Sequence, residues 1–310
     1  MLKKTLLPFL VFLIIFPFIV EAKGIVILAK KMQGEIPLDS KDAKWEQIKP
    51  LSIPLTAQVM NIPRLYETSI KEIQVRAMHN QEEVAFLVQW KDDSQDASLD
   101  IDKFSDSVAL EFPSSTDKEK PRFSMGDNEN PVNIWYWKAA LQTAATDEKL
   151  MPNKTYDANW KTSGYVTVDG FSPATHVNNP ISSTMPSSFE NIVARGFGTA
   201  ANMDRAKTQS ITGSGMWESG MWSVIFKRQL PAPDKLDVEF KEGTVSPISF
   251  AVWNGSVQNR GGKKELSTWY YVGIETETKI IAYILPVIVF ALVGGLVYYL
   301  VLILRKRAIA

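Results

Sequence analysis

The sequence predicts a mainly β fold, an antiparallel β-sandwich followed by one C-terminal transmembrane helix. Two observations lead to this expectation. Short runs with strand composition recur between turn residues along most of the chain, with little helical periodicity. A long apolar run without charges then stands at the C-terminal end. The chain shows no internal repeat that would indicate a solenoid or a propeller.

The first strands are expected in an extended segment, residues 24–66, which is punctuated by prolines. Within it, Trp45 and residues 51–59 have the composition of strands. Residues 70–77 and 84–90 flank a polar turn and predict a β-hairpin. The remaining strands are expected at residues 107–112, 132–137, 211–217, 222–228, 236–240, 248–253 and 269–274.

Residues 143–190 interrupt this pattern with a polar stretch rich in Ser, Thr, Asn and Pro. It contains the run NNPISSTMPSS and has no regular hydrophobic period. Long loops of this kind inside compact domains are usually functional or face a partner. We therefore expect a long loop inserted in the β domain.

The N-terminus has the features of a secretory signal peptide. Lys3 and Lys4 precede an apolar run from Leu6 to Val20, and Ala22 supplies a small residue for cleavage. The sequence therefore predicts a signal peptide over residues 1–22. An uncleaved membrane anchor is the alternative.

At the other end, a transmembrane helix is expected over residues 279–304, because the run from Ile280 to Leu304 has no charge and is long enough to span a bilayer. The basic residues 305–307 follow it immediately. By the positive-inside rule, residues 305–310 are expected in the cytoplasm and residues 23–278 on the exported, periplasmic side. The expected protein is thus an exported β domain anchored by its C-terminal helix.

Composition excludes several classes of function. Lys and Arg number 34 and Asp and Glu also number 34, so no surplus charge would attract nucleic acid. The absence of cysteine excludes disulfides, cysteine-bound iron–sulfur clusters, covalently attached c-type haem and thiol catalysis. With only 2 histidines, a His-rich zinc or multihaem site is excluded as well. Any haem held by this chain would be non-covalent.

Motifs of common enzymes are also missing. No hydrolytic triad or phosphate loop is present, and Gly196 and Gly198 are too isolated for a dinucleotide fingerprint. His79 lies in a predicted hairpin turn and His176 in the polar stretch, and both are expected to be ordinary side chains, His79 exposed. An acidic stretch could bind calcium but lacks the spacing of an EF-hand, so a solvated loop is favoured; its members are Asp92, Asp93, Asp96, Asp100 and Asp102.

Residues 122–139 hold the most distinctive local pattern, a Met125–Gly126 turn followed by an aromatic strand. A glycine after the methionine would let the backbone approach a flat ligand closely. Trp135 and Trp137 fall on one face of the strand, and Lys138 falls on the other. The pattern suits a large flat apolar ligand and also suits an ordinary sandwich core, which is the commoner outcome.

Four segments resemble, in this order, the haem-binding γ subunits of ethylbenzene dehydrogenase, dimethylsulfide dehydrogenase, selenate reductase and nitrite oxidoreductase. The first is the Met-Gly turn leading to Pro-Val and a Trp-x-Trp-Lys-Ala strand. The others are ARGFG (194–198), GSGMWESGMW (213–222), and FAVWNG (250–255) leading to KKELS (263–267). The resemblance extends over residues 40 to 275.

This resemblance implies one non-covalent haem b with methionine and lysine as axial ligands of the iron. Met125 is the position that matches the methionine of the family's turn. Lys264 in the closing motif is the preferred lysine, followed by Lys138 and then by Lys207, which aligns only loosely. A ligating lysine must be neutral and therefore needs a dry site that lowers its pKa.

Three arginines could pair with the haem propionates through bidentate hydrogen bonds, although surface salt bridges would explain them equally well. They are Arg195, Arg228 and Arg260.

The resemblance further implies a non-catalytic electron-transfer subunit of a molybdenum oxidoreductase. Its partners would be an iron–sulfur subunit and a molybdenum catalytic subunit, with a soluble cytochrome or the quinone pool as redox partner. The rival interpretation is a membrane-tethered carbohydrate- or ligand-binding β-sandwich without haem. Such a module would present Trp135 and Trp137 as exposed aromatic side chains.

Overall fold

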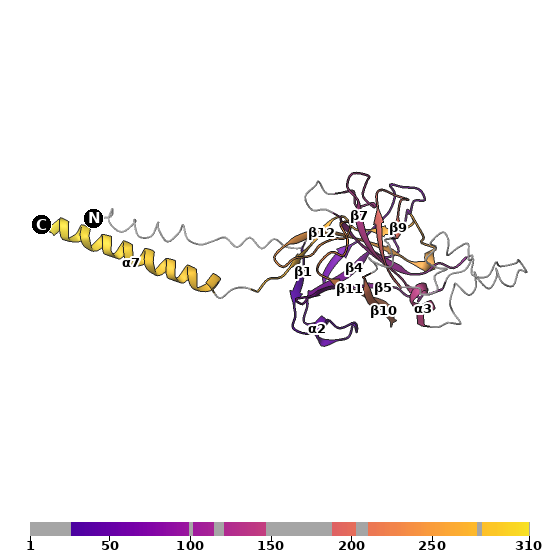
Figure 1. Ribbon diagram of the computed structural model, residues 1–310, viewed down its shortest axis with the longest axis horizontal. Helices are drawn as coiled ribbons and strands as arrows, with labels where there is room; N and C mark the ends of the chain where they lie inside the picture. Colours follow the sequence, from indigo (N-terminus) through magenta and orange to yellow (C-terminus); the bar gives the residue numbers. More distant parts are fainter. Residues whose placement is uncertain are drawn as a thin grey trace, which may run out of the picture.

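The computed structural model describes residues 26–98, 102–114, 121–146, 188–202, 210–277 and 281–309. The expected signal peptide (1–22) lies outside these residues, as does nearly all of the polar stretch expected at 143–190. In Figure 1 the strands gather in one β domain, and the C-terminal helix α7 (Ile281–Ile309) extends clear of it.

The strands of the β domain have the following bounds: β1 (Val26–Lys31), β2 (Leu51–Pro54), β3 (Thr56–Ala57), β4 (Glu72–His79), β5 (Glu83–Lys91), β6 (Ser107–Pro113), β7 (Val132–Lys138), β8 (Phe189–Ala194), β9 (Ala201–Asn202), β10 (Thr212–Glu218), β11 (Met221–Gln229), β12 (Val245–Trp253), β13 (Glu265–Leu266) and β14 (Tyr270–Ile274). Its helical segments are α2 (Ala43–Glu46), α3 (Ala139–Thr146) and the 3-10 turn η2 (Gly255–Val257).

The strands are hydrogen-bonded in the order β10-β11-β5-β4-β1-β14-β12-β6-β7-β8-β9, with β2 beside β4 and with β13 joining β12 to β3. The predicted mainly β class is confirmed, but the sheet is mixed and not purely antiparallel. β1 runs parallel to both of its neighbours, placing Ala29 opposite Ala77 in β4 and Ile274 in β14. A parallel neighbour needs a long crossover connection, and residues 32–71 supply one between β1 and β4.

The sheet curls until strands from its two ends pack against each other. Gly215 in β10 faces Trp137 in β7, and a Cβ on that glycine would come within 2.3 Å of the indole. Gly213 in the same strand would meet the ring of Phe189 in β8 at 2.6 Å. The two glycines of the GSG sequence therefore make room for aromatic rings across the core. The result is a nearly closed, barrel-like body.

The tryptophans of the aromatic strand belong to the hydrophobic core. Trp135 and Trp137 are both fully buried. Trp135 packs against Phe86, Phe112 and Phe240 with ring centroids 5.1–5.9 Å apart. Of the two roles that the sequence left open for this face of β7, the structure shows core packing. It also removes the exposed aromatic pair on which the carbohydrate-binding interpretation depended.

Three local expectations are wrong. Residues 236–240 do not form a strand, because Val238 and Phe240 turn into the core and Phe240 donates its backbone N–H to the Leu230 carbonyl. Trp45 lies in the short helix α2 and not in a strand. His79 is buried at the end of β4, where its Nε2 lies 2.9 Å from the Glu275 carbonyl oxygen.

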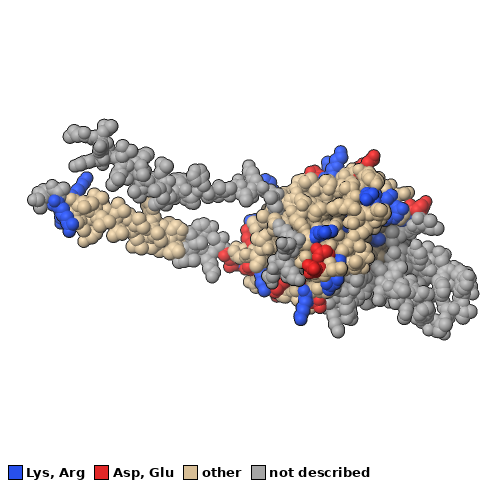
Figure 2. Space-filling model, turned by 90° about the horizontal axis from the view of Figure 1, so that it is seen from above, with Lys and Arg blue, Asp and Glu red and all other residues tan. Residues whose placement is uncertain are grey.

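Helix α7 is apolar along residues 284–304, and all of these residues are exposed except the half-buried Ile303. The span Ile284–Arg307 is long and apolar enough to cross a membrane, judged by length and composition. Pro286 lies inside the helix, and Lys306 and Arg307 occupy its last turn. Figure 2 shows the basic side chains at the far end of an otherwise uncharged rod. The helix continues through the basic residues instead of ending before them.

Candidate functional site

A pocket of about 400 Å³ lies on the outer face of β6, β7 and β12. Alternation along each strand separates this pocket from the core. In β7, Trp135 and Trp137 point into the core, whereas Tyr136 and Lys138 line the pocket. The volume falls within the range of about 300–1,000 Å³ that is usual for small-molecule and cofactor sites.

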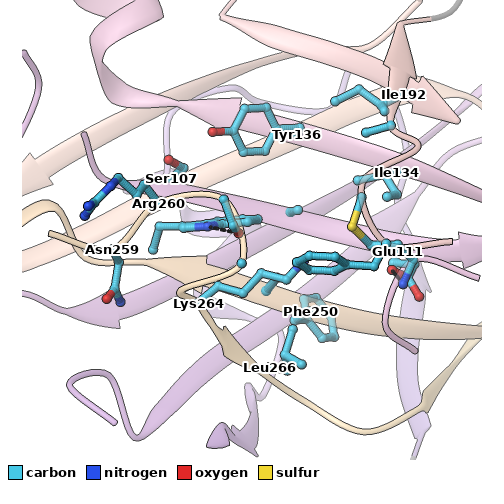
Figure 3. Close-up of a pocket in the computed structure, with 18 of the residues that line it drawn as sticks. Ser107, Glu111, Ile134, Tyr136, Ile192, Phe250, Asn259, Arg260, Lys264 and Leu266 are labelled. Atoms are coloured by element: carbon cyan, nitrogen blue, oxygen red, sulfur yellow. Dashed lines mark hydrogen bonds between the residues drawn. The ribbon is translucent and has the colours of Figure 1, made fainter. Parts of the chain in front are cut away.

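The walls of the pocket are largely apolar and aromatic. Figure 3 shows Lys264 and Glu111 between Tyr136 on one side and Phe250 and Leu266 on the other. Tyr136 packs edge-to-face on Trp253 with ring centroids 5.6 Å apart. Loops add further rings and small residues to the lining, among them Phe104, Phe123, Phe197, Gly198, Gly261 and Gly262.

Met125 lies in this pocket in an unusual backbone conformation, with φ of +76°. Its N–H donates to Oε2 of Glu111 over 3.1 Å, and its carbonyl oxygen accepts the N–H of Gly196 over 2.8 Å. Gly126 has a φ of +68°, and a Cβ there would meet the Asn130 carbonyl oxygen at 2.7 Å. The ARGFG segment and the Met-Gly turn, distant in sequence, therefore build one local structure.

Lys264 enters the same pocket from the turn before β13 and is only 6% exposed. Its backbone carbonyl accepts the N–H of Gln58 over 3.0 Å, which fixes the turn. Its Nζ lies 5.1 Å from the ring centroid of Trp253. Burial lowers the pKa of Lys264, and the negative charge of Glu111 opposes this change. The dry environment that a neutral lysine requires is thus present at this position.

Glu111 was not singled out from the sequence. It lies in β6 on the pocket face and is 7% exposed. Burial raises the pKa of Glu111, while Lys264 and the Met125 N–H oppose the increase. Its Oε1 is buried without a hydrogen-bond partner among the described residues. An acidic residue inside the short apolar strand SVALEF is the sequence signal that could have revealed it.

The other two lysine candidates are less enclosed or cannot be placed. Lys138 is half-buried at the pocket, with its Nζ 5.9 Å from the ring centroid of Tyr136. Lys207 lies outside the described residues. The structure therefore brings Met125, Lys264 and Lys138 to one pocket, and Lys264 is the more deeply buried of the two lysines.

The three arginines occupy different places. Arg260 lines the pocket, and its guanidinium lies 4.3 Å from the ring centroid of Phe104. Arg195 is exposed and does not line it. Arg228 is neither a surface residue nor a pocket residue: it is buried in the core, 4.9 Å from the ring centroid of Trp135. Arg260 is the only one of the three beside the pocket.

The remaining candidates that the structure describes do not line the pocket. His79 is held in the β4 region by backbone carbonyls, and His176 lies outside the described residues. In the acidic stretch, Asp92 and Asp96 both accept hydrogen bonds from the Ser94 hydroxyl, and Asp100 is outside the described residues. No cluster of three or more His, Asp or Glu side chains able to hold a metal ion occurs in the described part of the chain.

Residues 42–265 match the family model described as "Ethylbenzene dehydrogenase". This chain belongs to the ethylbenzene dehydrogenase family. The resemblance drawn from the four sequence segments is thereby confirmed. Within this family member, the Met-Gly turn, ARGFG and KKELS meet at the pocket, and GSGMWESGMW supports the core behind it.

Several curated relatives of this family member align over most of their length. A protein named as a respiratory nitrate reductase heme subunit of Haloferax mediterranei is 23% identical over 82% of this chain and 78% of its own. The dimethylsulfide dehydrogenase subunit gamma of Rhodovulum sulfidophilum is 25% identical over 76% and 74%. The chlorate reductase subunit gamma of Ideonella dechloratans is 22% identical over 78% and 81%.

Among solved structures, a family 9 carbohydrate binding module from Caldicellulosiruptor kristjanssonii in complex with glucose matches with a TM-score of 0.41 and 8% identity. The match covers 82% of this chain and 97% of the module.

Proposed function

We propose that this chain is a membrane-anchored b-type cytochrome that binds one non-covalent haem b in the pocket on β6, β7 and β12. One observation carries the proposal. Met125 and Lys264, which are far apart in sequence, both line a single apolar pocket, and each has the chemistry of a haem ligand. When bound, the haem supplies a one-electron iron couple.

The residues present fit this cofactor. The Met125 thioether would be a soft ligand on one side, and the buried amine of Lys264 would be the second ligand. Aromatic walls such as Tyr136 and Trp253 suit a flat ring. Arg260 stands beside the pocket as a partner for a propionate. Lys138 is less enclosed and is therefore the weaker candidate for iron ligation.

The names of the relatives support the role of this chain in a complex. One relative is named a heme subunit, and two are named gamma subunits of oxidoreductases. We propose that this chain carries single electrons between an iron–sulfur subunit and a soluble cytochrome or quinone, and that a molybdenum subunit performs the catalysis. The chain itself performs no catalysis in this scheme.

The proposed arrangement at the membrane follows from α7 and its basic end. The helix would anchor the protein, with residues 305–310 in the cytoplasm and residues 23–278 on the periplasmic side. Residues 1–22 would be a cleaved signal peptide.

The deciding experiment is the spectrum of the full-length chain purified in detergent. A reduced spectrum with the bands of b-type haem, one haem per chain, is expected. Met125→Leu nearly conserves volume, so packing should cost under about 1.5 kcal/mol. That variant should keep its fold while the haem becomes high-spin or labile.

Lys264→Met tests the second ligand, and Lys138→Met is its matched control. Loss of the low-spin spectrum is expected for Lys264→Met alone. An unchanged spectrum in Lys264→Met together with a lost spectrum in Lys138→Met would assign the ligand to Lys138. A colourless wild-type protein that binds glycans would contradict the cytochrome altogether.

A further inference from the structure

We infer that Glu111 is a positioning residue for both proposed haem ligands: one carboxylate oxygen holds the backbone of Met125, and the other lies buried in the pocket that Lys264 also lines. This inference rests on the proposed haem site. It adds a role for a residue that is not itself an iron ligand.

The hydrogen bond from Met125 to Glu111 stabilises an unfavourable backbone conformation of Met125. A non-glycine residue at φ of +76° is strained, and such strain of about 1–3 kcal/mol persists only when the surroundings fix the conformation. Two hydrogen bonds fix it here. Gly196 donates to the Met125 carbonyl, and Glu111 Oε2 accepts the Met125 N–H over 3.1 Å. Glu111 supplies the side-chain half of this pair.

The contact is itself well anchored, because Glu111 projects from the middle of the sheet. β6 is hydrogen-bonded to β7 on one side and to β12 on the other, with Glu111 opposite Ile134 and Ser249. A carboxylate on a central strand cannot shift with a loop. Glu111 therefore fixes the Met125 turn relative to the sheet.

Glu111 Oε1 is buried and makes no hydrogen bond in the described part of the chain. A neutral amine bound to iron keeps N–H groups that need an acceptor. Among the described residues that line the pocket, Glu111 is the acidic side chain and Lys264 is the deeply buried amine.

Asn259 offers a second acceptor at the pocket, since its Oδ1 is also buried and has no hydrogen-bond partner among the described residues. Its Nδ2, however, already donates to Glu265 over 2.8 Å, and its side chain makes no hydrogen bond to Met125. Among the described pocket residues, Glu111 both accepts the Met125 N–H and interacts electrostatically with Lys264. Removing it should therefore disturb the two sides of the haem together.

The test compares variants of the full-length chain in detergent. Glu111→Leu removes the acceptor at similar volume, and Glu111→Gln keeps an acceptor oxygen. Glu265→Gln is the matched control, because Glu265 is also buried and adjoins Lys264 but does not line the pocket. The readouts are the low-spin absorbance spectrum, the rate of haem transfer to apomyoglobin, and circular dichroism for the fold.

Loss of an outer residue that orients a metal ligand typically weakens binding by about 10–100-fold, so Glu111→Leu should lose haem at least about tenfold faster, with a reduced low-spin fraction. Glu111→Gln should largely restore the low-spin spectrum, and Glu265→Gln should match the wild type. If Glu111→Leu fails to fold, Glu111→Met is measured in its place as a second acceptor-free variant. Wild-type haem loss and spectrum in a folded acceptor-free variant would overturn the inference.

The same measurements on Met125→Leu distinguish the proposed ligation by Met125 from the positioning role of Glu111. A changed spectrum in Met125→Leu with an unchanged one in Glu111→Leu rejects only the positioning role. An unchanged spectrum in both variants rejects the Met125 ligand itself.

Discussion

Met125 shows how the backbone restricts the chemistry available at one residue. Its φ of +76° excludes β-branched replacements without strain. Histidine, like asparagine and aspartate, is enriched among the non-glycine residues that adopt this region. The turn is therefore compatible with a different iron ligand at the same position.

Met125→His should accordingly fold and keep a low-spin haem. Imidazole favours ferric iron more than a thioether does, so the reduction potential should fall. Redox titration followed by absorbance measures the change, with Met125→Leu as the variant that lacks a ligand. A potential equal to or above that of the wild type would contradict ligation at this position.

Asp106 is a second single residue with a testable effect, which concerns the stability of the fold and not the pocket. Burial raises the pKa of Asp106 to about 7, although N–H donors from Gly255, Asp96 and Trp222 oppose the change. The unfolded chain has the ordinary value of 3.8. Between about pH 4 and pH 7, Asp106 is protonated in the folded protein but ionised in the unfolded chain. The stability gained from this bound proton is therefore complete below about pH 4 and is lost as pH rises through about 7.

Relative to Asp106→Asn, which cannot ionise, the wild-type protein should therefore lose stability between pH 4 and pH 7, at most about 1.4 kcal/mol per pH unit. Thermal midpoints of both proteins, followed by tryptophan fluorescence, measure the difference. Parallel pH profiles for the two proteins would show that Asp106 stays ionised in the folded state.

At the scale of elements, the contact between β10 and β7 determines how the sheet closes. Gly215→Ala places a Cβ within 2.3 Å of the Trp137 indole and should cost about 1–3 kcal/mol through overpacking. Gly273→Ala in β14 is the matched control, since its Cβ would meet only ordinary contacts from 3.5 Å. Chemical unfolding should show a loss for the first variant only. Equal effects of both would indicate that β10 does not pack on β7 in this way.

The sequence predicted the elements whose signals are local. The hairpin of β4 and β5 has a polar turn between two apolar runs, and the aromatic strand alternates cleanly, so both were found. The segment 236–240 has the same local composition, yet Phe240 is drawn into the core and the backbone leaves the ladder. The parallel placement of β1 depends on strand pairing across the whole domain, which composition does not encode.

The site was also predicted only in part, because some of its residues have local sequence signals and others matter only through contacts made in the fold. Met125 and Lys264 were found through family motifs, and the structure places them in one pocket. Glu111 was missed because its importance comes from its surroundings in the fold: it accepts a hydrogen bond from a turn and interacts electrostatically with a lysine, and both are remote in sequence. Arg228 was misjudged as a surface residue, because the aromatic rings that bury it come from β7 and from the segment after β11.

At the scale of the whole molecule, the β domain and α7 can be separated experimentally. The described residues that line the pocket lie between 104 and 266, and none of them belongs to α7. A chain that ends at residue 278 should be released from the membrane and should keep the haem spectrum. A membrane-bound or colourless product would show that the helix does more than anchor.

The proposed orientation of α7 has its own test. A reporter fused after Ala310 should be active as a cytoplasmic fusion, because Lys306 and Arg307 occupy the last turn. Activity only with a reporter that works outside the cytoplasm would reverse the orientation.

Strand β1 lies between β4 and β14 and runs parallel to both. This placement also limits when the domain can finish folding. Val26 pairs with Tyr271, so the first strand obtains one of its two neighbours from nearly the last part of the domain to be synthesised. Until β14 emerges, one edge of β1 stays unpaired and open to wrong pairing. Such non-local contacts are slow to form. Correct folding of this protein should therefore depend on protecting the unpaired edge of β1 from wrong pairing until β14 has been synthesised.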